Sequence, residues 1–403
     1  MKINNYLIGL AAPSVYGFII FCIIAIQYQY YGLGVLSTIL AIILITSLLI
    51  NFGTSPWIIR ISANSQNNLN KISYEFSNAV FINLFISGLI YFLILITEEL
   101  NFSLFGTGNE LFLKLLVISF ITSFNKNINA IYIGLNHDKN FMLSSLIRGT
   151  TVLIYILFQS DEIFNLVVNG ILLGEISYVI FWIFKYKLTF FKIYYFNKST
   201  FITQAKFGYK HIPTSLSDEA IYRIDVLMIG FFKGPTIVGL YSIISLGLEV
   251  LRELARTTFV TRSSYIIEKD NYFSKSEIIK TRNTLIKVAL ILFTLGLIGA
   301  FIGLDVLKLF TNLEIQNNTK LYLFIFSTIT ALLSSNIFLK EVLPHINLPG
   351  LNSVVSVLSL IINVVCNFYL IPRYDILGAL LASSFSVFVA LILRFLLLKR
   401  SLF

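Results

Sequence analysis

Charged side chains are scarce in this chain: Asp, Glu, Lys and Arg make up 12% of its 403 residues, whereas soluble domains carry about 25%. Hydrophobic residues account for 57% of the chain, and the mean hydropathy is +0.83. A water-soluble protein of this length could not bury so much apolar side chain in one or two cores. The composition therefore excludes a soluble globular protein and indicates a polytopic membrane protein.

Cysteine and histidine are also rare, and their positions exclude common metal and disulfide sites. Cys22 and Cys366 lie in separate apolar runs with no second ligand nearby, while His137, His211 and His345 share no helix and show no metal spacing. There is no Gly-rich phosphate loop and no pair of carboxylates beside a nucleophile. The sequence predicts neither an enzyme nor a metal cofactor.

Long apolar runs fill most of the chain. A membrane-spanning helix needs about 20 predominantly apolar residues, and these lengths favour helices over barrel strands of about 10 residues. The predicted fold class is therefore all-α, with about twelve transmembrane helices. The expected spans are 6–27, 33–52, 76–97, 111–134, 141–159, 163–184, 207–232, 236–257, 285–306, 320–339, 351–371 and 376–397.

The net charge of +10 is distributed in a way that predicts topology. If the N-terminus is cytoplasmic, two cytoplasmic segments, 185–210 and 252–287, carry six and eight Lys or Arg residues. All charged residues in the outer loop 97–110 are acidic. This alternation follows the positive-inside rule, so both termini are expected in the cytoplasm. It explains the basic composition without a nucleic-acid partner.

The spans divide into two equal halves. The basic and aromatic segment 185–210 separates six spans from six, as in transporters built from two repeats. The predicted domains are an N-terminal six-helix lobe (1–184), a cytoplasmic connector at the membrane interface (185–206) and a C-terminal six-helix lobe (207–403).

Three segments carry motifs in the order and spacing of a known transporter family: NFGTSPWIIR (51–60), DVLMIGFFKGPTIVGLYS (225–242) and NFYLIPRYDILGALLASSFS (367–386). They resemble the polysaccharide-biosynthesis exporters, and the size and layout of the chain are similar to the O-antigen flippases of the Wzx type. The positions that match in the second half are Asp225, Gly230, Gly234, Val238, Gly239, Tyr241, Asn367, Pro372, Gly378 and Ala382.

The resemblance implies a MATE-like fold of the MOP superfamily, with two six-helix lobes around a central cavity. Members of the family move an oligosaccharide linked to polyprenyl (undecaprenyl) diphosphate to the outer leaflet of the bacterial inner membrane by alternating access. The expected partners are this lipid-linked oligosaccharide, membrane lipids and other polysaccharide assembly proteins. No cofactor is expected beyond H⁺ or Na⁺ as a coupling ion.

Four basic residues are predicted to bind the diphosphate: Arg148, Lys126, Arg223 and Arg60. Charges in the bilayer are costly, so those retained within spans point to a function. Arg148 lies about midway along its span with no acid within a turn, and Arg can hold phosphate oxygens in a bidentate fork. Arg60, at the inner end of span two, has snorkelling to the interface as an alternative.

Span seven contains three acidic residues that we consider for ion coupling: Asp225, Asp218 and Glu219. Asp225 is the leading choice because the family motif includes it. Glu219 and Arg223, at positions i and i+4, have simple pairing as an alternative. Two alternatives to ion coupling remain for Asp225: solvation near the outer interface, or a structural contact with Arg223 or with a backbone end.

Two further groups of charges lie toward the cytoplasmic ends of their spans. Span eight ends in a stripe expected to form an inner-gate ion network, with direct substrate contact as the alternative: Glu249, Arg252, Glu253 and Arg256. Arg394, near the end of span twelve, is expected to snorkel to the interface.

Two other functions are compatible with the sequence. A small-molecule or multidrug exporter would share the fold, but cation-coupled drug exporters commonly use an acid in the first span, and residues 3–59 carry no charge. A membrane polysaccharide polymerase or ligase would need a large outer loop, and the outer connections here are at most about 14 residues long.

Overall fold

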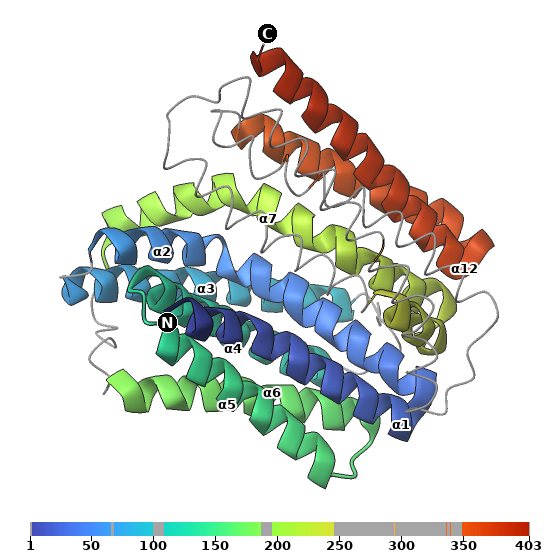
Figure 1. The fold of residues 1–403 in the computed structure, drawn as a ribbon, viewed down its shortest axis with the longest axis horizontal. Helices are drawn as coiled ribbons and strands as arrows, with labels where there is room; N and C mark the ends of the chain where they lie inside the picture. Colours follow the sequence, from blue (N-terminus) through green and yellow to red (C-terminus); the bar gives the residue numbers. More distant parts are fainter. Residues whose placement is uncertain are drawn as a thin grey trace. The chain divides into compact units, whose positions relative to one another are not determined.

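In the computed structural model of the chain, the described residues are 2–65, 68–99, 109–186, 196–245, 294, 336, 339 and 349–402. All regular secondary structure in these residues is helical (Figure 1), as the apolar runs predict. The principal helices are α1 (Lys2–Asn51), α2 (Thr54–Asn64), α3 (Leu69–Glu99), α4 (Asn109–Gly134), α5 (Asp138–Phe158), α6 (Ile163–Tyr186), α7 (Lys198–Lys233) and α12 (Pro349–Leu402). A shorter apolar helix spans Pro235–Ser245.

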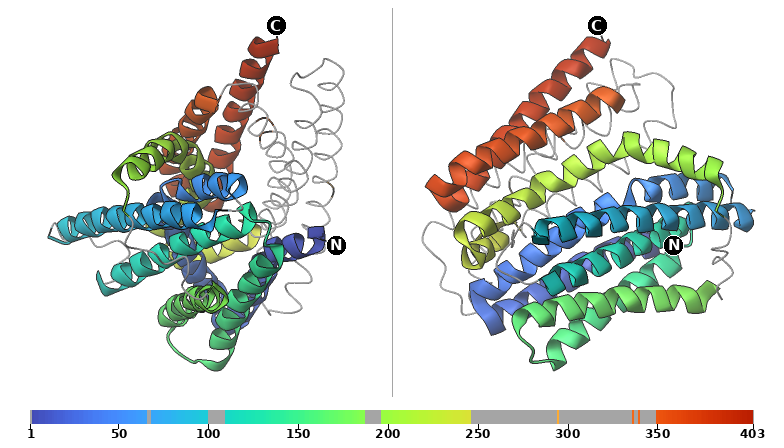
Figure 2. Two further views of the ribbon diagram at one scale, coloured as in Figure 1. Left: turned by 90° about the vertical axis from the view of Figure 1, so that its left-hand side faces the viewer. Right: turned by 180° about the vertical axis from the view of Figure 1, so that it is seen from behind.

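The two longest helices are hairpins rather than single rods. The backbone leaves helical geometry at Gln29 (φ 52°) in α1 and at Asp375 (φ 50°) in α12. Each helix reverses direction at its kink, as Figures 1 and 2 show for both. With 50 and 54 residues, each exceeds the roughly 20 residues of one crossing. Helix α1 corresponds to predicted spans one and two, and helix α12 to predicted spans eleven and twelve.

Six helices in the described part of the chain are long and apolar enough to cross a membrane. They are Ala11–Asn51, Leu69–Ile96, Leu111–Gly134, Asp138–Phe158, Ile163–Lys185 and Gly350–Leu397. The all-helical membrane character is thereby confirmed. Predicted spans nine and ten, 285–306 and 320–339, fall outside the described residues apart from three isolated positions. The total of twelve spans stays a prediction.

The chain forms two compact units. Unit 1 comprises residues 1–23 and 38–216, and unit 2 comprises residues 24–37 and 217–403. The division in α7 lies between Leu216 and Ser217, four residues after Pro213, which removes a backbone hydrogen bond inside the helix. The described end of the predicted connector, 198–206, is continuous with span seven as the start of α7.

An aromatic cluster holds three helices of unit 1 together. The ring centroid of Phe76 on α3 lies 5.4 Å from that of Phe124 on α4 and 5.4 Å from that of Trp182 on α6. Phe124 and Trp182 are themselves 6.0 Å apart in an edge-on arrangement, which favours aromatic pairs. This packing fixes α4 against α6, the two helices that carry much of the polar site described below.

A buried polar network provides hydrogen-bond partners for polar groups at the break between α1 and α2. Phe52 and Gly53 have positive φ values of 46° and 70°, and a broken helix inside a membrane must find other partners for its polar groups. Asn127 Oδ1 on α4 accepts hydrogen bonds from Asn51 Nδ2 (3.1 Å), Thr54 Oγ1 (2.9 Å) and Ser55 Oγ (2.9 Å). The 51–60 motif is therefore a hydrogen-bonded helix break.

Close backbone packing joins two parts of unit 2. A Cβ atom added to Gly34 would overlap the carbonyl of Pro235, and one added to Gly239 would overlap the carbonyl of Tyr30. Small residues allow helices in membranes to approach in this way. The motif residue Gly239 thus permits contact between the short Pro235–Ser245 helix and the tip of the α1 hairpin.

Candidate functional site

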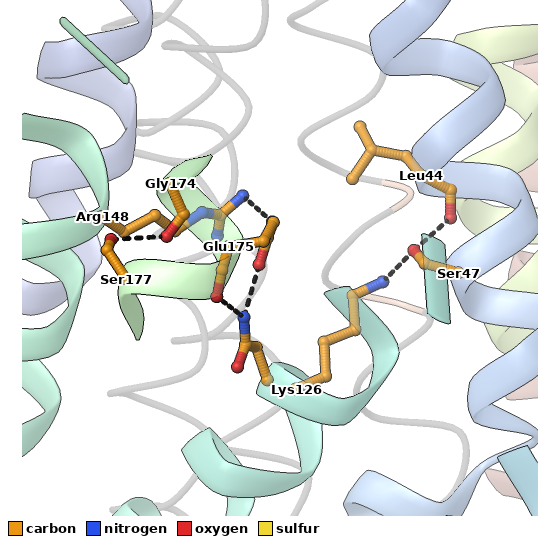
Figure 3. Close-up of polar contacts among 8 residues, drawn as sticks. Leu44, Ser47, Lys126, Arg148, Gly174, Glu175 and Ser177 are labelled. Atoms are coloured by element: carbon orange, nitrogen blue, oxygen red, sulfur yellow. Dashed lines mark hydrogen bonds and ion pairs between the residues drawn. The ribbon is translucent and has the colours of Figure 1, made fainter. Parts of the chain in front are cut away.

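An ion pair between neighbouring helices is the central feature of the charged site in unit 1. Arg148 Nη2 on α5 lies 2.7 Å from Glu175 Oε1 on α6, and Figure 3 shows the two side chains reaching toward each other. The Glu175 side chain is 0% exposed, whereas that of Arg148 is 38% exposed. Arg148 has no acid within a turn of its own helix, as the sequence indicates, but its partner comes from the next helix.

Glu175 was missed by sequence reasoning. It is the single acid in the apolar run of α6, GILLGEISYV (170–179). A lone carboxylate inside a membrane span is itself a functional signal, so attention to acids as well as bases in the first half would have found it. The neighbouring Gly174 lets α6 approach α5, because a Cβ there would crowd Val152 and lie 3.2 Å from the Arg148 carbonyl.

Asn125 on α4 holds the buried carboxylate from the other side. Its Nδ2 donates to Glu175 Oε2 at 2.6 Å and to the Glu175 backbone carbonyl at 3.0 Å. The Asn125 side chain is buried as well. Glu175 is therefore fixed by two contacts to α4, whereas the guanidinium that neutralises it extends from α5 and remains accessible.

Lys126, the next residue along α4, points in another direction. Its Nζ donates to Ser47 Oγ on α1 at 2.9 Å, and Ser47 donates to the Leu44 carbonyl at 2.9 Å. In Figure 3, Lys126 extends toward α1 while the Arg148–Glu175 pair lies on the opposite side. Arg60, the remaining predicted cation of the first half, is exposed on α2.

Unit 2 contains a different kind of charged site, built around Asp225 on α7. The residue is 1% exposed. Asn367 Nδ2 donates to its Oδ1 at 2.6 Å, the Tyr241 hydroxyl donates to its Oδ2 at 2.8 Å, and the Ser383 hydroxyl donates to the same oxygen. The interpretation of Asp225 as solvated at the interface is therefore wrong, and its described partners are neutral side chains rather than Arg223.

The side chains around Asp225 present several oxygen atoms. Asn363 Oδ1 accepts from Asn367 Nδ2 at 3.0 Å, and Asn363 Nδ2 donates to Ser383 Oγ at 3.0 Å. The Asn367 Oδ1 atom is buried with no hydrogen-bond partner in the described part of the chain. One carboxylate, amide oxygens and hydroxyls are hard ligands that suit a cation or a proton. The cluster, here called the Asp225 cluster, draws on α7, the Pro235–Ser245 helix and both halves of α12.

The remaining predicted site residues are an ion pair on α7 and residues outside the described part of the chain. Arg223 Nε lies 3.6 Å from Glu219 Oε1, which is the pairing considered as an alternative. The side chain of Asp218 lies outside the described part of the structure. The predicted inner-gate network lies outside the described residues: Glu249, Arg252, Glu253 and Arg256.

The expectation that Arg394 snorkels to the interface is wrong. Arg394 is only 2% exposed. The guanidinium donates from Nε to Asn352 Oδ1 (2.9 Å), from Nη1 to Asn336 Oδ1 (2.6 Å) and from Nη2 to Ser356 Oγ (2.6 Å). Charge-assisted hydrogen bonds to these neutral acceptors hold the side chain inside unit 2.

Comparison with solved structures identifies the fold. The chain is similar to the lipid II flippase MurJ in an inward closed conformation, with TM-score 0.73 and 15% identity over 98% of this chain and 87% of that one. It is also similar to an inward-facing MATE family multidrug resistance transporter of the MOP superfamily, with TM-score 0.68 and 16% identity over 97% and 96%.

A third similar structure, a MOP superfamily transporter from Pyrococcus furiosus, has TM-score 0.58 and 15% identity over 98% of this chain and 93% of that one. No protein-family model matches the chain, and no curated protein matches it in sequence. These identities show the fold alone: the chain has the all-helical fold of MOP superfamily transporters, a fold that serves more than one function.

Proposed function

We propose that this chain uses the MOP transporter fold to move an oligosaccharide linked to polyprenyl diphosphate across the bacterial inner membrane by alternating access. The observation that carries the proposal is the ion pair in unit 1 between Arg148, whose side chain is accessible, and the fully buried carboxylate of Glu175. A similar structure is a lipid II flippase by name, and the polysaccharide-exporter motifs support a related lipid-linked substrate.

The diphosphate is proposed to bind the cations of unit 1. Arg148 provides a planar fork that matches two phosphate oxygens, and Lys126 adds a point charge from α4. Arg60 on α2 is proposed to act nearer the cytoplasmic mouth, and Arg223 on α7 stays a separately proposed contact of the diphosphate. A substrate with about two negative charges needs this kind of cationic environment, since an unpaired anion in a membrane interior is costly.

The Asp225 cluster is proposed to bind the coupling ion, H⁺ or Na⁺. Its carboxylate is buried among neutral partners, so a bound cation or proton would offset its charge. The helices that supply its partners would respond to the change in charge, which links ion binding to the transport cycle.

A multidrug exporter is the second candidate function, because the Asp225 cluster would serve any cation-coupled cycle and a MATE transporter is among the similar structures. The two functions differ in the charge of the substrate. A cationic drug requires an accessible acid in the lobe that binds it, whereas Glu175 is buried and already paired with Arg148.

Reconstitution into liposomes tests the proposal directly. A lipid-linked oligosaccharide is placed in one leaflet, and its movement is followed by exposure of the sugar to a lectin that cannot cross the membrane. We expect the protein to accelerate this movement and to leave a cationic dye such as ethidium untransported. Transport of the dye without movement of the lipid would establish the exporter instead.

Topology provides an independent test of the proposed orientation. A reporter active only outside the cytoplasm should be silent when fused after Phe403 and active when inserted at Gly106. The reverse pattern would refute the orientation with both termini in the cytoplasm.

A further inference from the structure

We propose that Glu175 is an internal competitor for Arg148: it pairs with the guanidinium when the site is empty and loses this partner when the diphosphate binds. Glu175 would then set the affinity of unit 1 for its anionic substrate and the ease of substrate release. This inference rests on the proposed function and assigns a role to a residue that does not itself touch the substrate.

The difference in exposure between the two partners supports an exchange. Glu175 is fully buried, but more than a third of the Arg148 side chain is accessible. A phosphate group can therefore reach the guanidinium without first reaching the carboxylate. In the described part of the chain, Glu175 is the only side chain that forms a hydrogen bond or ion pair with Arg148.

Anchoring determines which partner moves. Asn125 binds both the Glu175 carboxylate and the Glu175 backbone carbonyl, so the acid is held by α4 whether or not Arg148 is present. Arg148 has a long flexible stem and one described polar contact. We infer that the guanidinium swings to the diphosphate while Glu175 stays in place.

The exchange has an energetic consequence. A buried carboxylate that loses its counter-ion is left uncompensated, and this state is strongly unfavourable. Diphosphate binding must therefore overcome the attraction of Glu175 for Arg148, which keeps the affinity low enough for release on the other side. Removing the charge of Glu175 should strengthen diphosphate binding and slow release.

The substitution Glu175→Gln tests this, because an amide keeps the shape of the side chain and its oxygen can still accept from Asn125. The probe is farnesyl diphosphate, titrated calorimetrically into the purified full-length protein in lipid nanodiscs. We expect Kd to fall roughly tenfold. A merely structural role predicts weaker binding or no change, and either result would overturn the inference.

Two variants separate this inference from the proposed function. Arg148→Ala should weaken farnesyl diphosphate binding, and in its background Glu175→Gln should have no further effect, since the competition needs both partners. If Arg148→Ala leaves Kd unchanged, the proposed diphosphate site itself is wrong. If Arg148→Ala weakens binding but Glu175→Gln does not strengthen it, only the competition fails.

Glu75→Gln is the matched control within unit 1. Glu75 is also a buried acid, but its Oε2 accepts a hydrogen bond from Trp57 Nε1 at 2.8 Å. Its substitution should leave Kd unchanged, and a comparable gain in affinity there would overturn the assignment to Glu175. If Glu175→Gln does not fold, Glu175→Asp replaces it. The shorter side chain keeps the charge but moves it away from Arg148, so a smaller gain in affinity is expected. No gain in affinity would overturn the inference.

Discussion

The charged sites of the two units contrast in composition and in exposure. In unit 1 an acid and a base form a pair, and the base is accessible. In unit 2 a single acid is buried among hydroxyl and amide groups. A neutral pair can exchange one partner for an incoming anion, whereas an isolated carboxylate attracts a cation. Under the proposed function, this contrast assigns the anionic substrate to the unit 1 site and the coupling cation to the unit 2 site.

Charge reversal at Arg148 should have the largest effect. Arg148→Glu would place a second acid beside the buried Glu175, and the like charges would destroy any site for a phosphate. We expect transport of lipid-linked oligosaccharide in liposomes to fall roughly a hundredfold or more, equivalent to about 3 kcal/mol. Membrane insertion and elution as a single species should persist. Normal transport by this variant would remove Arg148 from the substrate site.

Neutralising Asp225 should affect ion coupling instead. Asp225→Asn retains a polar side chain of the same shape but removes the charge that a coupling ion would offset. Transport should no longer respond to an imposed proton or sodium gradient. Asp375→Asn is the control in the same unit, because Asp375 pairs with Lys233 at 2.6 Å and is 55% exposed. An Asp225→Asn protein that still responds like its parent would make the cluster purely structural.

Arg148→Lys should have an intermediate effect on the anion site. The charge remains, but the planar fork that binds two oxygens is lost. We expect Kd for farnesyl diphosphate to rise about tenfold, with partial transport retained. Calorimetric titration measures this change. Equal affinity of the two proteins would show that charge alone, rather than the fork, determines binding.

Packing around glycine should affect thermal stability rather than transport or binding. Gly239→Ala would force a methyl group against the Tyr30 carbonyl in unit 2, whereas no atom lies within 4 Å of a Cβ at Gly88 in unit 1. Overpacking of this kind costs about 1–3 kcal/mol, so the thermal midpoint should fall for Gly239→Ala and hold for Gly88→Ala. Equal midpoints would refute the close contact of the α1 hairpin with the Pro235–Ser245 helix.

The apolar runs predict the described membrane helices well, because a continuous helix satisfies its backbone polar groups within the bilayer without any partner from elsewhere in the chain. The turns at Gln29 and Asp375 fall between predicted spans for the same reason. Helix identity and span limits are local properties, and the sequence carries them directly.

Side-chain partners are less accessible to sequence reasoning. Arg148 and Glu175 are far apart in the chain, and only the packing of α5 against α6 brings them together. The partners of Asp225 likewise come from Tyr241, Asn367 and Ser383 on other segments. The family motif marked Asp225, Tyr241 and Asn367 but gave no reason for their association. Arg394 was misread because its position near a helix end is typical of snorkelling, whereas its neutral acceptors lie on distant residues.

A crossed measurement tests the division between the units most directly. Transport of lipid-linked oligosaccharide is measured in liposomes for Arg148→Lys and Asp225→Asn, each over a range of substrate concentrations and with or without an imposed ion gradient. We expect Arg148→Lys to need more substrate while keeping its response to the gradient, and Asp225→Asn to keep its substrate dependence while losing that response. If both variants change both properties alike, the anion and cation functions are not divided between the Arg148 site and the Asp225 cluster.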